Sequence, residues 1–281
     1  MDFEIPFVEE FNKYFQIIVA DTDELRSRAY KLRYQVYCLE VPNGLDPKDF
    51  PDGEETDEYD CYARQALLVH RPTGLVAGTV RLVLDNDQDP LWMFPVEAQV
   101  PELAGSAEFA PVRSKLAEIS RFILSSRFRA RRYERLYPDG LAVDSSSNPY
   151  TDMDHRHIPH PILGIFKAGL DLSWDAGVRF WYSAMEPRLH RRLQMFGLDL
   201  GGALASIEYH GNRCVYLSYL PDVLAKCRRE RLQIWRFLTD DGRKWSQSTS
   251  ALDENSKVAT PKNGSYEWDL TSDGKSTSRT E

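Results

Sequence analysis

The stretch KLAEISRFILSS, residues 115–126, places two opposite charges inside an apolar strand pattern. Its aliphatic and aromatic residues are typical of a buried strand, yet Glu118 and Arg121 stand among them. Residues three apart on a strand point to opposite faces, so these two can pair only where a bulge re-aims one side chain. An unpaired buried charge is costly. The sequence therefore predicts that each charge has a partner elsewhere in the chain.

Partners of the required sign lie in three other segments. Arg33 falls in a predicted helix, Asp57 and Asp60 lie in an acidic loop at residues 46–60, and Arg81 ends the motif GTVR. Together with the strand, they predict one network of carboxylate and guanidinium groups that holds the loop over a sheet. Two interpretations stay open, a purely structural ion-pair network and a functional site built on it.

The order of the predicted elements indicates the fold class. Helical segments show apolar residues at three- to four-residue spacing, and the strands are short apolar runs bounded by turn residues. In chain order we expect a helix at 23–38, a hairpin at 63–84, a strand at 118–125, a helix at 161–177, a strand at 178–185, a helix at 187–197, a hairpin at 203–220 and a helix at 222–238. This mixture indicates an α/β fold, an α+β sandwich. No Gly-rich phosphate motif follows a strand, which argues against a Rossmann or P-loop enzyme.

Composition divides the chain into a single folded domain at residues 1–242 and a tail at residues 243–281. The tail is rich in Ser and Thr and poor in large apolar side chains, so we expect it to be disordered. A polar segment at about 127–160 is long for a connection within a compact domain. We therefore interpret it as a connector inserted into the domain.

Bulk properties exclude several classes of function. The net charge of −8 argues against nucleic acid as a partner. No apolar run approaches the roughly 18 residues of a membrane span, and the acidic N-terminal stretch is unlike a signal peptide. We therefore expect a cytoplasmic protein. The four cysteines show neither paired nor metal-ligand spacing, so we expect free thiols.

Four motifs resemble the signature of the acyl-homoserine-lactone (autoinducer) synthases: KLRYQVY (31–37), EETDEYD (54–60), GTVRLV (78–83) and EISRF (118–122). Their order and spacing agree with that family over about residues 20–125. The matching positions are Arg33, Tyr37, Asp57, Asp60, Arg81, Glu118, Ser120 and Arg121. The resemblance implies a GNAT-like mixed sheet with splayed central strands and helices on both faces, and an enzyme that moves an acyl chain to an amine.

The C-terminal half is similar to a related branch, the PEP-CTERM/exosortase system-associated acyltransferases. PILGIFKAGLDLS, YSAMEPRLHRRLQMFGLDL and IEYHGNRCVYL carry this resemblance, which covers most of residues 20–220. The branch is also similar to the N-acyl amino acid synthases. Asn43 stands where the autoinducer synthases have a Trp that shapes the amine side. An amino acid is therefore an alternative acceptor to S-adenosylmethionine.

The resemblance also implies roles for single residues. Amide formation from a thioester needs a base for the amine proton and donors for the oxyanion. We expect Glu118 to be the base, with Ser120 and Arg121 completing the catalytic set and a bulge near Ser120–Phe122 offering N–H groups. Residues expected to bind substrate are Arg33, Tyr37, Asp57, Asp60, Arg81 and Phe122. No cofactor is expected to stay bound, since the donor is the acyl-phosphopantetheine of acyl-carrier protein or acyl-CoA.

The connector carries two further expectations. Acyl-carrier proteins are acidic, so the basic stretch RFRARRYER is predicted to dock one through Arg127, Arg129, Arg131 and Arg132. The alternative is a solvated connector without a docking role. DMDHRHIPH has the composition of a zinc-binding tract, with Asp152, Asp154, His155, His157 and His160. Acyl transfer requires no metal, so we expect no metal and interpret the tract as a loop with solvated histidines.

Three functions follow from these observations. The favoured one is an N-acyltransferase that takes a fatty acyl group from acyl-carrier protein or acyl-CoA to an amine. The second is a long-chain N-acyl amino acid synthase, and the third is a non-catalytic acyl-carrier-binding module of an exosortase-linked system. In the strand at 178–185, the aromatic residues Phe180, Trp181 and Tyr182 are expected either to line an acyl tunnel or to pack in the hydrophobic core without a role in binding.

Overall fold

A computed structural model describes residues 7–41, 44–104, 110–128, 160–208 and 211–245. Its centre is one seven-stranded sheet with the strand order β1-β2-β3-β4-β5-β7-β6. Every neighbouring pair is antiparallel except β4 and β5, which run parallel. The strands are β1 (Phe15–Val19), β2 (Ala63–His70), β3 (Val76–Leu84), β4 (Leu116–Leu124), β5 (Phe180–Met185), β6 (Ala203–Glu208) and β7 (Asn212–Tyr219).

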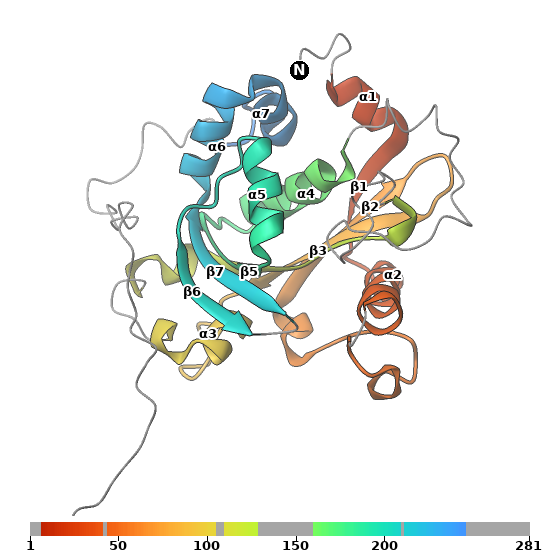
Figure 1. The fold of residues 1–281 in the computed structure, drawn as a ribbon, viewed down its shortest axis with the longest axis vertical. Helices are drawn as coiled ribbons and strands as arrows, with labels where there is room; N and C mark the ends of the chain where they lie inside the picture. The colour runs from red at the N-terminus through yellow and green to blue at the C-terminus, as the bar shows by residue number, and fades with distance from the viewer. Residues whose placement is uncertain (1–6, 42–43, 105–109, 129–159, 209–210, 246–281) are drawn as a thin grey trace, which may run out of the picture.

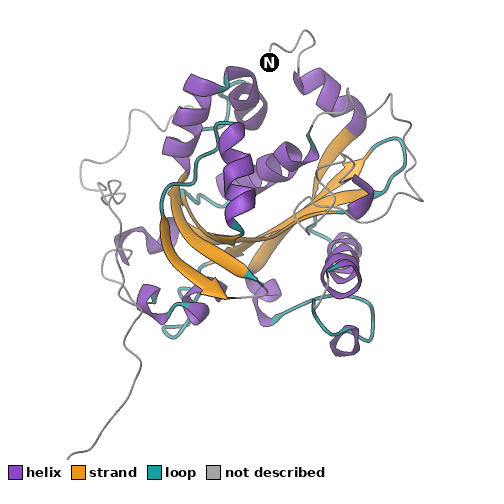
Figure 2. Ribbon diagram, in the orientation of Figure 1, coloured by secondary structure: helices purple, strands orange, loops and turns teal. Residues whose placement is uncertain are grey.

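Helices cover both faces of the curved sheet (Figures 1 and 2). On one face, which we call the α4 face, α4 packs with α1, α5, α6 and α7, and the opposite face carries α2 and α3. The helices are α1 (Phe7–Tyr14), α2 (Asp23–Tyr34), α3 (Pro95–Gln99), α4 (Pro161–Asp175), α5 (Pro187–Met195), α6 (Leu220–Glu230) and α7 (Leu232–Thr239). The arrangement is a GNAT-like α/β fold, as the sequence predicts.

The two central strands part along their length. Hydrogen-bonded pairing of β4 with β5 runs from Leu116–Phe180 to Ile119–Ser183 and ends there. Beyond that point β4 continues to Leu124 and keeps pairing only with β3. Since no ladder joins the strands beyond Ile119, side chains from both faces of the sheet can meet in the gap.

β4 also contains the bulge that the sequence predicts. Thr79 of β3 lies opposite Ile123, while Arg81 lies opposite Ser120, so two residues of β4 face one residue of β3. Arg121 takes a positive φ of 49° at this place, a conformation that costs a non-glycine residue energy. The bulge therefore turns Arg121 out of the regular alternation of the strand.

A close approach of α4 to the sheet fixes the floor of this region. Gly78 of β3 lies between α4 and the neighbouring strand, because a Cβ there would lie 2.5 Å from Ile165 Cδ1 of α4 and 2.6 Å from the Ile123 carbonyl oxygen of β4. A larger residue would require the Ile165 side chain to move and the β3–β4 pairing to shift. Since α4 also supplies Phe166 to the core, the glycine helps to set the depth of the space between helix and strands.

Four details differ from the sequence prediction. The segment Phe7–Val19 forms α1 and the edge strand β1, neither of which was expected. The first helix ends in a π-helical turn, Gln35–Glu40. The final helix is broken at Arg231, whose φ of −144° is not helical. Trp245, three residues past the predicted domain end at 242, is buried and packs against Trp174; the boundary itself stays a prediction.

Candidate active site

A cavity of about 400 Å³ opens where β4 and β5 separate. Its polar side is formed by the acidic loop and by residues of β3, β4 and α3, among them Asp57, Arg81 and Glu118. Its apolar side is formed by residues of β4, β5, α4 and α5 from the α4 face, among them Ile119 and Phe166. The cavity therefore joins the two faces of the sheet through the gap between its central strands.

Six charged side chains form a closed circuit beside the polar side. We call it the charge ring; its members alternate in sign in the order Arg33, Glu55, Arg121, Asp57, Arg81 and Asp60. A hydrogen bond between Arg33 and Glu55 closes the circuit. The other nitrogen–oxygen distances are 2.6 Å for Glu55–Arg121, 2.9 Å for Arg121–Asp57, 2.5 Å for Asp57–Arg81, 3.1 Å for Arg81–Asp60 and 2.7 Å for Asp60–Arg33. Three positive and three negative groups make the ring neutral.

The ring lowers the pKa values of two of its carboxyl groups, Glu55 and Asp60. Burial raises the pKa of Glu55, but the charges and hydrogen bonds of Arg121 and Arg33 outweigh it and lower that pKa to about 2. The pKa of Asp60 is likewise lowered, because bonds from Arg33 and the Asp57 amide outweigh its burial. Such a satisfied network tolerates burial, whereas removal of one member leaves a buried charge unpaired.

Glu118 stands in the opposite electrostatic situation. It is 4% exposed and forms no salt bridge with the ring. Its Oε2 accepts a hydrogen bond from the Val96 amide at 2.7 Å. Burial raises the pKa of Glu118 to about 7, against the lowering effects of that hydrogen bond and of Arg81. A carboxyl group with this pKa exchanges protons at neutral pH and lies on the cavity wall.

The partner expected for Glu118 is therefore corrected. The sequence predicted Glu118 as a member of the charge network, with Asp57 and Asp60 as its carboxylates. The ring instead takes Glu55 as its third carboxylate, and a backbone amide serves Glu118. The physical reason is placement: Glu118 points toward α3, while the bulge turns Arg121 toward the acidic loop.

Arg121 is held in its strained conformation from several directions. Its guanidinium bonds Glu55 and Asp57, and it lies 5.4 Å from the centre of the Tyr37 ring. These contacts with Glu55, Asp57 and Tyr37 offset the energetic cost of the positive φ at Arg121, which is of order 1–3 kcal/mol. Tyr37, from the π-helical turn after α2, therefore acts as a wall of the cavity and a support for Arg121.

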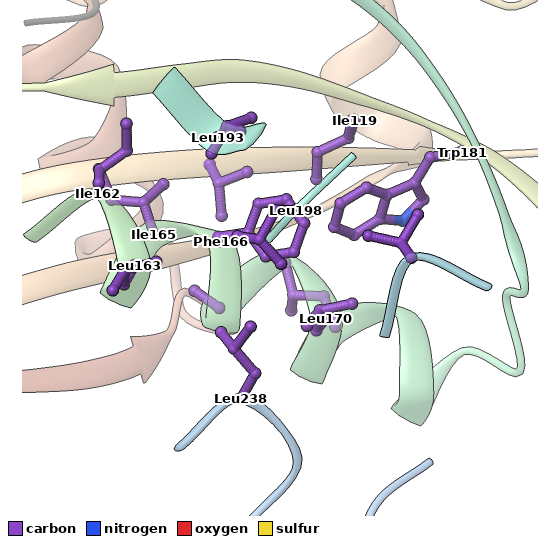
Figure 3. Packing of buried hydrophobic residues seen from close by; sticks show 14 of the residues in the cluster. Ile119, Ile162, Leu163, Ile165, Phe166, Leu170, Trp181, Leu193, Leu198 and Leu238 are labelled. Atoms are coloured by element: carbon purple, nitrogen blue, oxygen red, sulfur yellow. The ribbon is translucent and has the colours of Figure 1, made fainter. Parts of the chain in front are cut away.

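Side chains from both parting strands and two helices build the apolar side. Figure 3 shows Ile119, Phe166, Trp181 and Leu193 converging from β4, α4, β5 and α5. The rings of Phe166 and Trp181 meet edge to face at 5.3 Å, and the indole N–H donates to Ser173 Oγ at 2.8 Å. The remaining apolar wall includes Met185, Leu189 and Leu200. An alkyl chain would find no charged group among these side chains.

The other predicted site residues lie at the same cavity. Ser120 and Phe122 line it, and Ser120 Oγ accepts a hydrogen bond from Arg81 Nε at 3.1 Å. Of the aromatics of β5, Trp181 lines the cavity, whereas Phe180 and Tyr182 pack in the core on the opposite face. The alternation of the strand explains this division.

Three groups of the site were not predicted from the sequence. Glu55 lies within the quoted motif EETDEYD, two residues before Asp57. The Val96 amide carries no side-chain signal. Ser183 is 2% exposed and lines the cavity, and its Oγ has no hydrogen-bond partner among the residues that the structure describes.

Several predictions concern residues outside the described part of the chain. Asn43 and, within the connector, Arg129, Arg131, Arg132, Asp152, Asp154, His155 and His157 lie there. Arg127 is described, in a short 3-10 turn after β4, and His160 packs edge to face against Phe196 at 5.0 Å. Within the described ranges, no cluster of His, Cys, Asp and Glu could hold a metal ion, and no helix is long and apolar enough to cross a membrane.

Comparisons with known proteins found a family model and several similar solved structures. A family model described as an acetyltransferase (GNAT) domain matches residues 32–138, which is less than half of the chain. No curated protein matches. One similar solved structure is FeeM, an N-acyl amino acid synthase from uncultured soil microbes, at 13% sequence identity and a TM-score of 0.46; the match covers 78% of this chain and 97% of that chain. The AHL synthase LasI is 18% identical with a TM-score of 0.46, over 73% of this chain and 88% of that chain. The CoA-dependent acyl-homoserine lactone synthase MesI is 20% identical with a TM-score of 0.43, over 76% of this chain and 93% of that chain.

The family model assigns a GNAT acetyltransferase domain to residues 32–138, and the mixed sheet is the GNAT-like fold expected of an acyltransferase. The matched range contains every member of the charge ring and Glu118.

Proposed function

We propose that the protein transfers a fatty acyl group from a phosphopantetheine thioester to a primary amine. The observation that carries the proposal is Glu118: a buried carboxyl group with a pKa near 7, on the wall of a cavity with one polar and one apolar side. A general base is most effective when its pKa lies near the working pH. The polar side takes the amine, and the apolar side takes the alkyl chain.

The proposed reaction begins with the ionised form of Glu118. The amine nitrogen attacks the thioester carbonyl carbon, and Glu118, directly or through a water, takes the proton that the nitrogen loses. A C–N bond forms, the C–S bond breaks, and the proton passes to the departing thiolate. The products are an amide and a free thiol, and Glu118 returns to its ionised form.

Stabilisation of the tetrahedral oxyanion is assigned to the bulge of β4. Arg121 and Phe122 both lie opposite Val80, outside the regular ladder with β3. Backbone N–H groups freed from a ladder are suited to bind a developing negative charge. Arg121 itself acts as a positioning residue, because its guanidinium is committed to Glu55 and Asp57.

The alkyl chain is assigned to the space between α4, α5 and the parted strands. Burial of methylene groups is worth about 0.8 kcal/mol each, and the wall of Ile119, Phe166 and Leu193 supplies the apolar surface. The volume of about 400 Å³ is in the range of small-molecule sites. This favours a fatty acyl donor over an acetyl donor.

The proposal also names the donor, its docking site and the acceptor. The donor is acyl-carrier protein or acyl-CoA, and carrier docking rests on Arg127 with Arg129, Arg131 and Arg132 of the connector. S-adenosylmethionine and an amino acid are the acceptors that the sequence resemblance implies. A cytoplasmic location, a role in a PEP-CTERM/exosortase system and the single domain at 1–242 also belong to this proposal.

The experiment that tests the proposal measures thiol release from a medium- or long-chain acyl-CoA and from the matching acyl-carrier protein, with and without an added amine. We expect release that depends on the amine, together with an amide product by mass spectrometry. Tight donor binding without any release under either condition would instead support the rival function, a non-catalytic carrier-binding module.

A further inference from the structure

A cluster of arginines stands on the surface where three helices of the α4 face meet. α6 ends at Glu230, α7 begins at Leu232, and α5 reaches the junction with its last residue, Met195. Arg231 joins the three helices, because its Nε donates to the Met195 carbonyl oxygen at 3.3 Å and its Nη1 to that of Glu230 at 3.0 Å. We call this surface the basic corner. Its exposed cations are Arg191, Arg228, Arg229, Arg231 and Arg236.

The basic corner carries an excess of positive charge in an acidic chain. Its exposed acids are Glu230 and Asp241, and Asp241 lies 3.8 Å from Arg236. Beside the corner, Lys226 and Asp199 form an ion pair at 2.6 Å and neutralise each other. Five arginines against two carboxylates leave a local net charge of +3, while the whole chain carries −8. An anionic partner complements such a surface.

Apolar side chains are exposed among these charges. Met195 is 64% exposed and Leu232 is 44% exposed. Trp235 is half-buried, and the guanidinium of Arg228 lies 4.8 Å from the centre of its ring. Leu232 and Arg236 are one helical turn apart and share the outward side of α7. Basic residues mixed with Leu and Trp on a helix surface are typical of segments that lie on a lipid bilayer.

The opposite side of the sheet carries charge of the other sign. The acidic loop at 46–60 contains eight Asp and Glu residues and one Lys, and three of these acids belong to the neutral charge ring. Figure 1 shows this loop with α2 on the side of the sheet away from α5, α6 and α7. An anionic surface attracts the basic corner and repels the loop, so the charge distribution orients the molecule with the corner toward that surface.

We propose that the basic corner binds the surface of an anionic lipid bilayer, with Leu232 and Met195 entering the headgroup region. An acidic carrier protein suits the corner less well, because its thioester has to reach the cavity. α5 turns Leu189 and Leu193 toward the cavity, whereas Met195 is exposed and absent from the lining, as are the five arginines. The inference goes beyond the proposed function and does not depend on it.

The test is co-sedimentation of the full chain with lipid vesicles in the absence of substrate. One set of vesicles is phosphatidylcholine alone, and the other contains equal amounts of phosphatidylcholine and phosphatidylglycerol. We expect binding to the anionic vesicles that weakens as salt is added, since salt screens exposed charges, and little binding to the neutral vesicles. Equal binding to both sets, or no binding to the anionic set at low salt, would overturn the inference.

A pair of double variants locates the binding surface. Arg229→Gln with Arg236→Gln should weaken binding to anionic vesicles at low salt about 10- to 30-fold, since each basic residue near such a surface contributes about a factor of five. Lys48→Gln with Arg64→Gln removes the same charge from exposed positions outside the corner, and it should change binding less than about 2-fold. Equal losses in the two double variants would show an effect of net charge alone and would overturn the assignment to the corner.

Two further outcomes separate a bilayer from other partners. Leu232→Ser should weaken the binding that remains at high salt about 3- to 10-fold, because the exposed leucine no longer enters the bilayer. Unchanged binding in this variant would overturn the insertion of Leu232. If Arg229→Gln with Arg236→Gln slowed thiol release from an acyl-carrier donor and left vesicle binding unchanged, the corner would be a carrier-docking surface and the inference would be wrong.

Discussion

Two buried carboxyl groups beside one cavity behave in opposite ways. Glu55, in the charge ring, contacts two arginines, and its pKa is lowered to about 2. Glu118, on β4, contacts a backbone amide, and burial raises its pKa to about 7. Both are at most 4% exposed, so burial alone does not decide the protonation state. The comparison teaches that pairing converts one carboxylate into a fixed part of the scaffold and leaves the other free to titrate.

The largest expected effect is the loss of turnover on neutralising Glu118. Glu118→Gln keeps the shape of the side chain and removes the base, so kcat should fall by about 10²- to 10⁴-fold while the donor KM stays near that of the wild type. Steady-state thiol release measures both constants.

A neighbouring carboxylate provides the matched control. Glu97 is 1% exposed and bonds Arg113 and the Phe94 amide, and it is absent from the cavity lining. Glu97→Gln should therefore lower stability and leave kcat within a few-fold of the wild type. Equal losses of kcat in both variants would show that Glu118 acts through the fold and would remove it from the chemistry.

Breaking the charge ring should affect stability first. Glu55→Gln leaves Arg33 and Arg121 without a shared carboxylate, and loss of one partner from a buried pair costs about 3–5 kcal/mol. Glu54→Gln next to it removes a group that is 28% exposed and bonds Ser27 and Lys31, so its cost should stay below about 1 kcal/mol. Urea unfolding of the two variants measures the difference. Equal midpoints would mean that the ring contributes nothing to stability.

The two carboxyl groups should give opposite pH dependences of stability. The pKa of Glu55 is lowered, so its contribution is present above its unfolded value near 4.5 and is lost as pH falls toward 2. The pKa of Glu118 is raised, so its contribution is present below 4.5 and is lost as pH rises through about 7. Each shift corresponds to roughly 3 kcal/mol.

Stability measured against pH in the variants separates the two groups. Relative to the wild type, Glu118→Gln should gain stability between pH 5 and 8, while Glu55→Gln should lose it on moving up from acid pH. The rate of acyl transfer should also rise with pH and reach half of its maximum near pH 7, where Glu118 ionises. An alkoxyamine acceptor has a neutral nitrogen throughout this range, so with it the pH dependence reports on Glu118 and not on the acceptor. A flat profile with that acceptor would contradict the assignment of Glu118.

The smallest expected effect concerns the apolar side. Phe166→Leu removes ring volume from the cavity wall and keeps an apolar side chain, so the preferred acyl chain should lengthen, with selectivity changing by about 0.8 kcal/mol per methylene. Phe94→Leu makes the same substitution at a buried site of the opposite face, outside the lining. kcat/KM values for a series of acyl-CoA donors measure the preference. The same shift in both variants would argue against an acyl site at Phe166.

Much of the fold follows from local pattern. Apolar periodicity located the hairpin at 63–84, α4 and the strand around Glu118, because each buries one continuous set of side chains. The edge strand β1 was missed since its residues, FQIIV, follow a charged segment without a turn signal. The break at Arg231 was missed because the apolar pattern runs through it.

The sequence by itself determined the class of fold, the order of the main elements from the helix at 23–38 onward, and most of the charged residues from which the site is made. Tertiary structure alone decided which charges pair. Glu55 and Arg121 stand 66 residues apart in the chain, and they meet only because a bulge turns one strand residue toward the acidic loop. Electrostatic pairing depends on distances of a few ångströms through space, which spacing along the chain does not encode. The same few ångströms leave Glu118 outside the ring, with a carboxyl group that titrates near neutral pH.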